Sequence, residues 1–490
     1  MLKILSGPRR ACDGKQRREL LQAGGAGLFG LTLPKVLAAE SARPVGSPRA
    51  KSILFAFLYG GPSQLETVDM KPDAASAIRG PYRPIASRTP GLQICEHLPR
   101  LAARSDKFCV IRTLNHPQND HNGTHYIQTG HPLPPAERGA AMVDATDKDW
   151  PCFGSVVEYL DRRETGKPPA FPGYVFLPKR LGHFAGYDIN GQYAGWLGSA
   201  YDGMATNISK KNSGDNPFYR DCTDDELDFR MSGLDPQPQL TLDRFNRRES
   251  LLEQFDEQRR RLDASLNDSL AVRDFTSTRE RALALLTSDT VGAAFDIRRE
   301  PDKLRDQYGR NLFGQSLLMG RRMLEAGSRF VTVAWDLAVR GDVMGSWDMH
   351  AGLTRVMKDH LLPGLDLGLS ALLEDLESRG MLDETLVIAV GEMGRTPKFQ
   401  NRGQEDGRDH WTYCFPCILA GAGIQGGIAF GRSDKDAAWP ADHPVSCEDL
   451  ACTIYHALGI DPHAHLLRDK QDRPVALVEG GRVLSQLFRS

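Results

Sequence analysis

Continuous apolar runs separated by segments of helical periodicity make up most of this chain. Such runs occur at 52–58, 108–112, 173–177, 329–335 and 386–390. An unbroken apolar run is typical of a parallel strand that is buried on both faces. Helical segments at 317–326 and 350–379 stop at Gly327 and Gly380, as C-terminal glycines do. The alternation predicts an α/β fold whose mainly parallel sheet carries helices on both faces.

Two long segments depart from this alternation. Residues 179–235 lose periodicity and are rich in Gly, Asn, Asp and Tyr, so we expect an irregular insertion that faces a substrate. Residues 239–300 are highly charged and place apolar side chains at helical spacing, which predicts amphipathic helices on the sheet. Both segments would belong to one domain spanning 52–490.

The N-terminus indicates export. Paired arginines at Arg17 and Arg18 precede a weakly apolar run at 23–37, and small residues follow it. This order is typical of a twin-arginine signal, although an ordinary basic first helix is the alternative. We therefore expect a signal at 1–39, a flexible mature N-terminus at 40–51, the twin-arginine export machinery as a partner, and a periplasmic or extracellular location. No later run reaches the roughly 20 apolar residues of a spanning helix, so no stable membrane span is expected.

Composition narrows the function further. The 490-residue chain has a net charge of −2 and no basic stripe, which argues against a nucleic-acid partner. Cys414 and Cys417 have a redox-like spacing, but they lie in an apolar run that ends at Ala420. Buried strand cysteines are therefore favoured over a redox pair, which stays open as a weaker alternative.

Polar side chains with metal-binding chemistry follow several of the predicted strands. The last apolar run opens into a glycine-rich turn that carries a carboxylate, as the carboxyl edge of an α/β sheet does. Oxygen and imidazole groups that arrive from separate loops suit a divalent metal. The predicted metal ligands are Asp348, His350, Glu392, Asp409 and His410. Helix capping by Asp348 and an ion pair between Glu392 and Arg395 are the structural alternatives.

A second polar segment, 115–125, is dense in side chains that coordinate ions. His121 and His125 are four positions apart, so on a helix they would share a face. A solvated polar loop is the alternative, but so many histidines directly after a strand favour anion or metal binding.

Several motifs carry a family resemblance. The helix at 363–380 and the run into 379–388 resemble the stretch of sulfatases and related alkaline-phosphatase-superfamily enzymes that leads to their metal-binding turn, and 449–462 resembles their late helix. Together with the paired arginines, the motifs at 60–63, 195–202, 391–397 and 407–411 resemble one exported family. The chain is identified as a member of domain-of-unknown-function family fifteen-oh-one, placed in the alkaline-phosphatase-like superfamily.

The resemblance implies an alkaline-phosphatase/sulfatase-like fold and a site with some positions changed. Asp348, His350 and His410 resemble superfamily ligands. Gly60 stands where the superfamily has a metal-binding Asp, and Met393 stands where it has a His. No cysteine is available to become formylglycine.

These features predict a metal-dependent hydrolase of phosphate or sulfate esters, acting on small molecules or extracellular glycans. Thr124 would be the nucleophile, His121 and His125 would stabilise a leaving group or anion, and Arg395 or Arg408 would clamp charge on the ester oxygens. The divalent metal would be Zn or Mn in preference, with Ca or Mg open. The alternative is a non-catalytic secreted binding or structural protein that keeps the fold. The sequence leaves the oligomeric state open.

Overall fold

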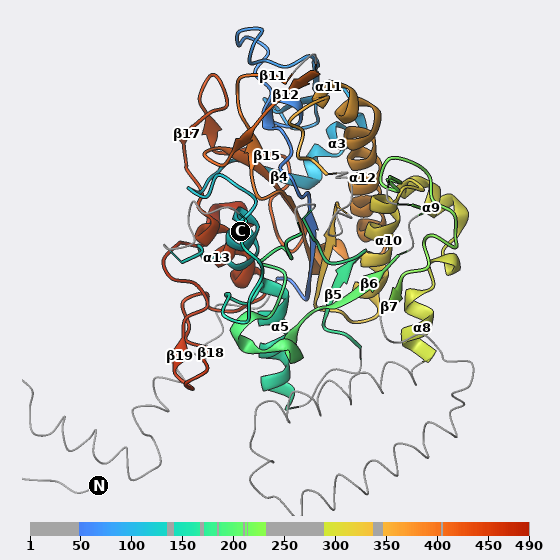
Figure 1. Cartoon of the computed structure of the whole chain (residues 1–490), viewed down its shortest axis with the longest axis vertical. Helices are drawn as coiled ribbons and strands as arrows, with labels where there is room; N and C mark the ends of the chain where they lie inside the picture. The colour runs from blue at the N-terminus through green and yellow to red at the C-terminus, as the bar shows by residue number, and fades with distance from the viewer. Residues whose placement is uncertain are drawn as a thin grey trace, which may run out of the picture.

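The computed structural model describes residues 49–134, 142–166, 171–183, 186–208, 211–212, 214–231, 289–336, 346–402 and 405–489. Its centre is a nine-stranded sheet in the order β15-β4-β14-β9-β1-β8-β5-β6-β7 (Figure 1). In chain order these strands are β1 (Ser52–Phe57), β4 (Phe108–Leu114), β5 (Tyr174–Leu177), β6 (Met204–Asn207), β7 (Arg230–Met231), β8 (Phe330–Ala334), β9 (Thr385–Val390), β14 (Phe415–Ala420) and β15 (Ile428–Phe430).

The sheet is mainly parallel. Only β14, which is antiparallel to β4 and β9, and the edge strand β7 break the parallel arrangement among these strands. The central strand β1 pairs with β8 and β9 and is buried along its whole length. Its sequence is continuously apolar because both of its faces are covered. The predicted fold class, α/β with a mainly parallel sheet, is confirmed.

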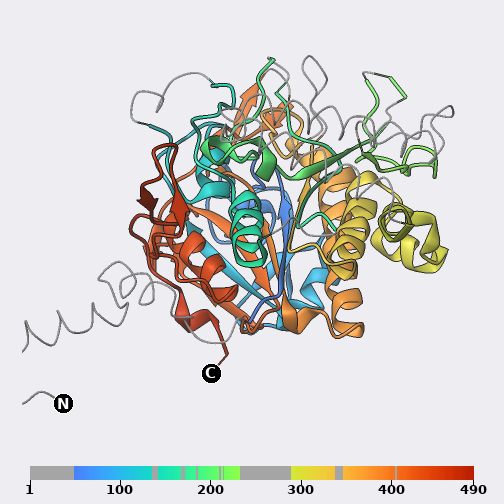
Figure 2. The ribbon, with the colours of Figure 1, turned by 90° about the horizontal axis from the view of Figure 1, so that it is seen from below.

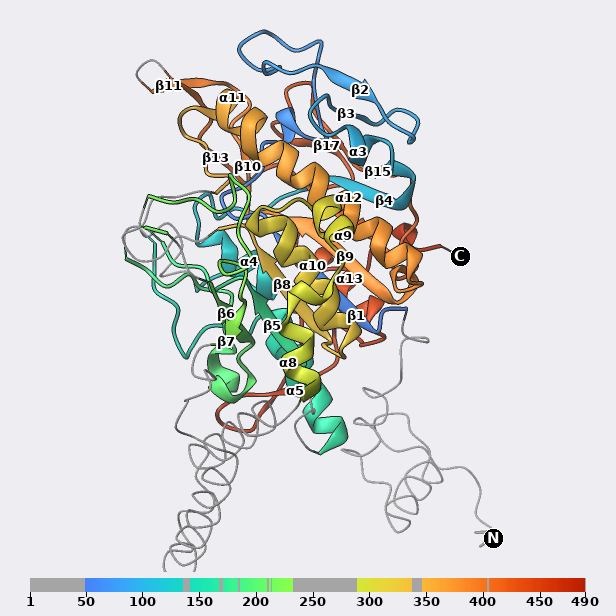
Figure 3. The ribbon, with the colours of Figure 1, turned by 90° about the vertical axis from the view of Figure 1, so that its right-hand side faces the viewer.

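Helices cover both faces of the sheet. On one side α10 (Leu312–Glu325) and α12 (Leu362–Ser378) pack in a core with Leu54 and Val331. On the other side α5 (Phe153–Thr165) and α13 (Cys447–Ala457) pack in a core with Phe55 and Phe330. Figure 2 shows α13, in red, and α10, in yellow, on opposite sides of the strands, and Figure 3 shows α10 and α12 in front of the sheet.

Shorter elements complete the fold. The remaining α-helices among the described residues are α3 (Pro99–Ala102), α4 (Gly123–Thr129), α8 (Asp289–Phe295), α9 (Asp302–Tyr308) and α11 (Leu353–Val356), and the π-helix η7 (Met357–Leu361) precedes α12. The remaining strands form two-stranded ribbons: β2 (Pro84–Ala86) with β3 (Gln93–Cys95), β10 (Gly394–Arg395) with β13 (His410–Trp411), β11 (Gln400–Arg402) with β12 (Glu405–Gly407), β16 (Arg432–Ser433) with β17 (Pro440–Asp442), and β18 (Leu467–Arg468) with β19 (Pro474–Val475).

The five predicted strands are confirmed to within two residues at either end. The helix predicted at 350–379 starts only at Leu353, because Gly352 adopts a left-handed conformation with φ of 64°. The predicted irregular insertion at 179–235 is wrong for β6 and β7, which extend the sheet beyond β5. Neighbouring strands supply the hydrogen bonds that make these short segments strands, so their own pattern gives no signal.

Three predicted segments lie wholly or partly outside the described residues: 1–39, 40–48 of the mature N-terminus, and 239–288 of the charged helical segment. The described end of that segment is helical, as α8 and η6 (Ile297–Arg299). Within the described residues, no helix has the length and apolar character needed to cross a membrane. Cys414 and Cys417 are both buried and unbonded to another cysteine, Cys417 within β14.

Candidate metal centre

The candidate ligands meet at the carboxyl edge of the sheet. His121 follows β4, Asp348 follows β8, and Glu392 follows β9. His410 lies in β13, directly before β14, and because β14 is antiparallel its start lies at this same edge. Crevices at the carboxyl ends of parallel strands are where open α/β sheets bind ligands.

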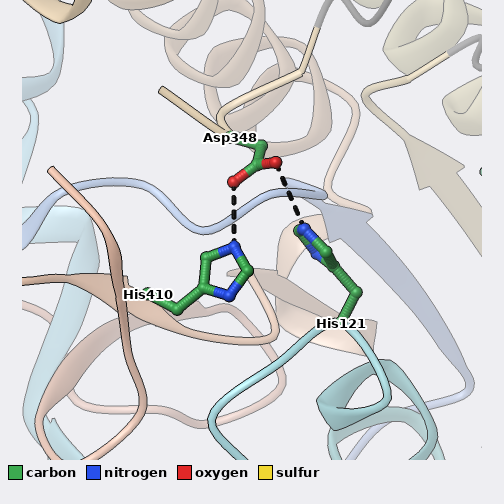
Figure 4. A group of neighbouring side chains, drawn as sticks. All are labelled: His121, Asp348 and His410. Atoms are coloured by element: carbon green, nitrogen blue, oxygen red, sulfur yellow. Dashed lines mark hydrogen bonds and ion pairs between the residues drawn. The ribbon is translucent and has the colours of Figure 1, made fainter. Parts of the chain in front are cut away.

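Three histidine side chains converge there on one carboxylate, that of Asp348. Asp348 Oδ2 is 3.2 Å from His121 Nε2, and Asp348 Oδ1 is 3.2 Å from His410 Nε2 (Figure 4). The ligand atoms of these three residues all lie within 4.8 Å of one another. His350 Nε2 joins them, 3.0 Å from Asp348 Oδ1 and 3.1 Å from His410 Nε2.

Two of the three histidines are held from behind by further carboxylates. His121 Nδ1 lies 2.7 Å from Glu392 Oε1, and His350 Nδ1 lies 2.7 Å from Asp409 Oδ1. In each pair Nδ1 carries the hydrogen and donates it, because a carboxylate only accepts. The Nε2 atoms of both rings then face Asp348. Carboxylate–imidazole pairs of this kind orient histidines that bind metals.

This arrangement fits a divalent cation. Imidazole lone pairs and a carboxylate oxygen that face one another at 3.0–3.2 Å repel unless a proton or a cation lies between them. A tetrahedral metal about 2.0–2.2 Å from each ligand atom holds those atoms roughly 3.4 Å apart, close to the spacing found. The residues present therefore match the geometry that a bound metal requires.

The charges of the ligands also suit a metal. Burial raises the pKa of Asp348, but Arg395 and His121 outweigh it and hold that pKa well below its ordinary value. Burial lowers the pKa of His410, with His121 and Arg395 acting in the same direction. Burial alone would lower the pKa of His121, yet Asp348 and Glu392 raise it to about 10. Asp348 is thus an anion, His410 is neutral, and His121 holds a proton that a metal would displace.

Arg395 supports the cluster from inside the protein. Its Nη2 lies 2.5 Å from Asp348 Oδ1 and also donates to the carbonyl of Gly60, while Nε and Nη1 donate to the carbonyls of Gly61 and Arg408. The residue is completely buried. Arg395 therefore balances the charge of Asp348 and fixes the turn after β1, with no surface through which to touch an ester.

Arg408 lies elsewhere than its predicted role requires. It forms a buried double ion pair with Glu66, from Nε at 3.0 Å and from Nη2 at 2.6 Å. The carbonyls of Ile78, Thr396 and Pro397 accept its remaining hydrogens. All five N–H groups of the guanidinium are used, so none is left for an ester oxygen.

The helix-face pairing predicted for His121 and His125 is wrong. Helix α4 begins at Gly123, so His121 precedes the helix and turns toward Glu392. His125 instead donates from Nδ1 to the carbonyl of His131 at 2.9 Å, and its Nε2 is buried without a hydrogen-bond partner. The hydroxyl of Thr124 is likewise buried without a partner, and no described contact joins it to Asp348. Its role as nucleophile remains a prediction.

Backbone packing explains why position 60 is a glycine. Gly60 has φ of 101°, and a Cβ there would lie 2.3 Å from the backbone nitrogen of Asp348. Its N–H donates to both oxygens of Glu392 at 3.0 Å. The approach of the two loops excludes any side chain at this position, and Glu392 takes up the hydrogen bond.

Two side chains near the metal centre were not predicted from the sequence. The ring of Tyr59 lies 5.1 Å from that of His121, and the ring of His183 lies 5.8 Å from it. Burial raises the pKa of Tyr59, and so do Glu392 and Asp336, the latter buried just past β8. The position of Tyr59 at the end of β1 was a usable signal. His183 carried none, because it lies within the segment predicted to be irregular.

The fold and the site define an α/β protein with a candidate histidine–carboxylate metal centre at the carboxyl edge of its sheet. Over residues 50–488 the chain matches the family described as "Protein of unknown function (DUF1501)", and it belongs to that family. The family predicted from the motifs is confirmed. No curated protein sequence matches the chain.

Similar solved structures include hydrolases. A sulfatase from Pseudoalteromonas sp., PsFucS1, is 12% identical, with a TM-score of 0.38 and coverage of 94% of this chain and 78% of its own. BT4656, solved with its substrate D-glucosamine-2-N,6-O-disulfate, is 14% identical, with a TM-score of 0.34 and coverage of 90% and 82%. The phosphonate monoester hydrolase SpPMH from Silicibacter pomeroyi is 12% identical, with a TM-score of 0.29 and coverage of 80% and 71%.

Proposed function

We propose that this protein is an exported, metal-dependent hydrolase of phosphate or sulfate esters. The observation that carries the proposal is the convergence of His121, His350 and His410 on Asp348, with two of the imidazoles oriented by carboxylates. Three nitrogen ligands and one carboxylate favour Zn or Mn, whereas Ca takes mainly oxygen ligands. Export rests on the N-terminal sequence pattern alone.

The side chains of the cluster differ in how far they are exposed to solvent. A divalent metal bound here would act as a Lewis acid toward an ester oxygen. His121 and Asp348 are buried and form the inner wall, while His350 and His410 have side chains that are 29% and 20% exposed. An ester would therefore approach from the side of His350 and His410. Arg395 keeps Asp348 ionised in this setting.

A non-catalytic binding protein is the second candidate. Two observations favour it. Close packing at Gly60 leaves no room for a metal-binding side chain at that position, and the hydroxyl of Thr124 has no described contact with the cluster. On this reading the cluster binds a metal and an anionic ligand without breaking a bond.

Metal analysis and ester assays on the purified protein test the proposal together. We expect a stoichiometric divalent metal and hydrolysis of 4-nitrophenyl phosphate or sulfate that a chelator abolishes and the metal restores. Asp348→Asn should lose both, whereas Glu384→Gln, at an exposed ion pair with Lys51, should keep both. Metal without hydrolysis would establish the binding alternative. A folded wild-type protein that holds no metal would overturn both readings of the cluster.

A further inference from the structure

His116 is a buried histidine just past β4, and its side chain links the loop after β4 to the loop after β9. The residue is only 3% exposed. Its Nδ1 accepts a hydrogen bond from the backbone N–H of Gln118 at 3.2 Å, so the ring hydrogen lies on Nε2. That Nε2 lies 2.6 Å from the backbone carbonyl of Glu392 and donates to it, because a carbonyl only accepts.

The carbonyl that His116 holds lies in the short link between β9 and β10, which supports the metal centre twice. Within the link, Glu392 Oε1 accepts the hydrogen of His121 Nδ1 at 2.7 Å. Directly after the link, β10 carries Arg395, the ion-pair partner of Asp348. The direction of one peptide carbonyl therefore influences two groups that hold candidate ligands in place.

Two further contacts pack His116 against other segments of the centre. Its backbone N–H donates at 2.9 Å to the carbonyl of Thr412, which directly follows the strand of His410. A Cβ on Gly123, the first residue of α4, would lie 2.8 Å from His116 Cε1 and 3.3 Å from the carbonyl oxygen of Glu392. Because α4 approaches this closely, a side chain at position 123 would push the ring away from the carbonyl.

We propose that His116 is a positioning residue of the metal centre, which fixes the loop of Glu392 and thereby sets the orientation of His121. Both ring nitrogens of His116 are used by backbone groups, so neither is left to bind a metal. Groups that orient a histidine ligand determine how well its ring meets the metal. The inference rests on the proposed function, since it requires that the cluster binds a metal.

A second buried histidine provides a matched control. His131 is 4% exposed, and its Nε2 donates to the carbonyl of Leu477 at 2.8 Å. Burial lowers the pKa of both histidines to about 4, so both rings are neutral. The His131 ring stacks on Trp150 at 3.6 Å, and no described contact joins it to the cluster. Replacing either ring removes the same kind of buried hydrogen bond, but only His116 acts on Glu392.

Metal titrations of the full chain test the positioning role. Competition with a chromogenic chelator measures the Zn²⁺ affinity, and the visible absorption of bound Co²⁺ reports the geometry of the ligands. His116→Phe keeps a ring but removes both nitrogens, so it should lower Zn²⁺ affinity about tenfold and shift the Co²⁺ spectrum. His116→Gln, whose amide can still donate to the carbonyl of Glu392, should stay within about threefold. His131→Phe should match the wild type in both measurements.

A variant of α4 perturbs the same contact from the other side. Gly123→Ala places a methyl group against His116 Cε1 and removes no hydrogen-bonding group. It should lower Zn²⁺ affinity by about threefold or more, because the ring has to move away from the carbonyl of Glu392. Thermal unfolding of each variant shows whether the fold survives, and Gly123→Ala provides the test if His116→Phe does not fold.

The outcomes separate this inference from the proposed function. If His116→Phe folds and keeps its Zn²⁺ affinity within about threefold, or if His131→Phe loses as much, the positioning role is wrong although the metal centre stands. If His116→Phe does not fold, an unchanged affinity in Gly123→Ala overturns the role instead. A folded wild-type protein that binds neither Zn²⁺ nor Co²⁺ would overturn the proposed function, and the role of His116 with it.

Discussion

Arg395 and Arg408 lie in the same part of the chain, are both completely buried, and both pair with a buried carboxylate, yet they serve different purposes. Arg408 and Glu66 form a closed pair, in which the guanidinium has no hydrogen left over. Arg395 shares Asp348 with three imidazole rings.

The two carboxylates, Glu66 and Asp348, differ in the set of groups that face them. A closed pair satisfies its own charges and can only fix the chain in place. The Asp348 carboxylate faces one guanidinium and three imidazole rings, and not every ring nitrogen that faces it carries a hydrogen to donate. A cation bound between such nitrogens and the carboxylate removes their repulsion. Burial is the same for the two arginines, so the hydrogen bonds of the partner carboxylate distinguish a structural pair from a candidate site.

Breaking the closed pair should have the largest effect on stability. Glu66→Ala leaves the Arg408 charge buried without a partner, which we expect to lower the free energy of unfolding by about 3–5 kcal/mol. Urea denaturation of the two proteins measures it. The matched control is Glu384→Ala, which removes one side of an exposed ion pair with Lys51 and should cost at most about 1 kcal/mol. Equal losses would remove the distinction between a closed buried pair and a surface pair.

Breaking the open cluster should act on metal binding. Asp348→Asn keeps the size of the side chain but removes the charge that faces all three imidazoles. We expect metal affinity to fall by at least about 100-fold, because loss of a mere supporting group already costs 10–100-fold. Competition with a chromogenic chelator measures the change. An affinity equal to that of the wild type would place the metal elsewhere.

Removing the metal should lower the stability of the wild-type protein but not that of Asp348→Asn. With metal at about 100 times its dissociation constant, a chelator should lower the stability of the wild-type protein by about 2.7 kcal/mol. Asp348→Asn should show no such change at the same metal concentration. Thermal unfolding with and without chelator provides the comparison, and a chelator response of equal size in the variant would contradict it.

The supporting carboxylate of His350 should matter less than Asp348 itself. Asp409→Asn keeps an acceptor for His350 Nδ1 but removes its charge, so we expect a loss of metal affinity near the lower end of about 10–100-fold. The same chelator competition measures it. A loss as large as that of Asp348→Asn would show that Asp409 binds the metal directly.

His125 provides the smallest expected effect. It lies in α4 and donates to the carbonyl of His131, outside the open cluster. His125→Gln should change metal affinity by less than about threefold, well below the effect of a supporting residue. A loss of metal affinity of about tenfold or more would show that His125 supports the metal centre, as its spacing from His121 suggested.

The strands could be predicted because their signal is local. The runs that became β1 and β9 are apolar at every position, and burial on both faces demands this of a central parallel strand. Asp348, His350 and His410 were also predicted as ligands, because side chains of metal-binding types lie in the loops that follow such strands. β6 was missed, since its hydrogen bonds come from β5 and leave no pattern in its own four residues.

The sequence by itself determined the α/β class, the family and the set of residue types available to bind a metal, since each depends on neighbouring positions along the chain. Only the tertiary structure decided which of them meet. His121 and Asp348 are 227 positions apart, and their contact depends on the order in which β4, β14, β9, β1 and β8 adjoin in the sheet. The tertiary structure also places His125 outside the cluster and pairs Arg408 with Glu66. Packing between distant segments decides which hydrogen-bond partners meet, and no local sequence pattern contains that information.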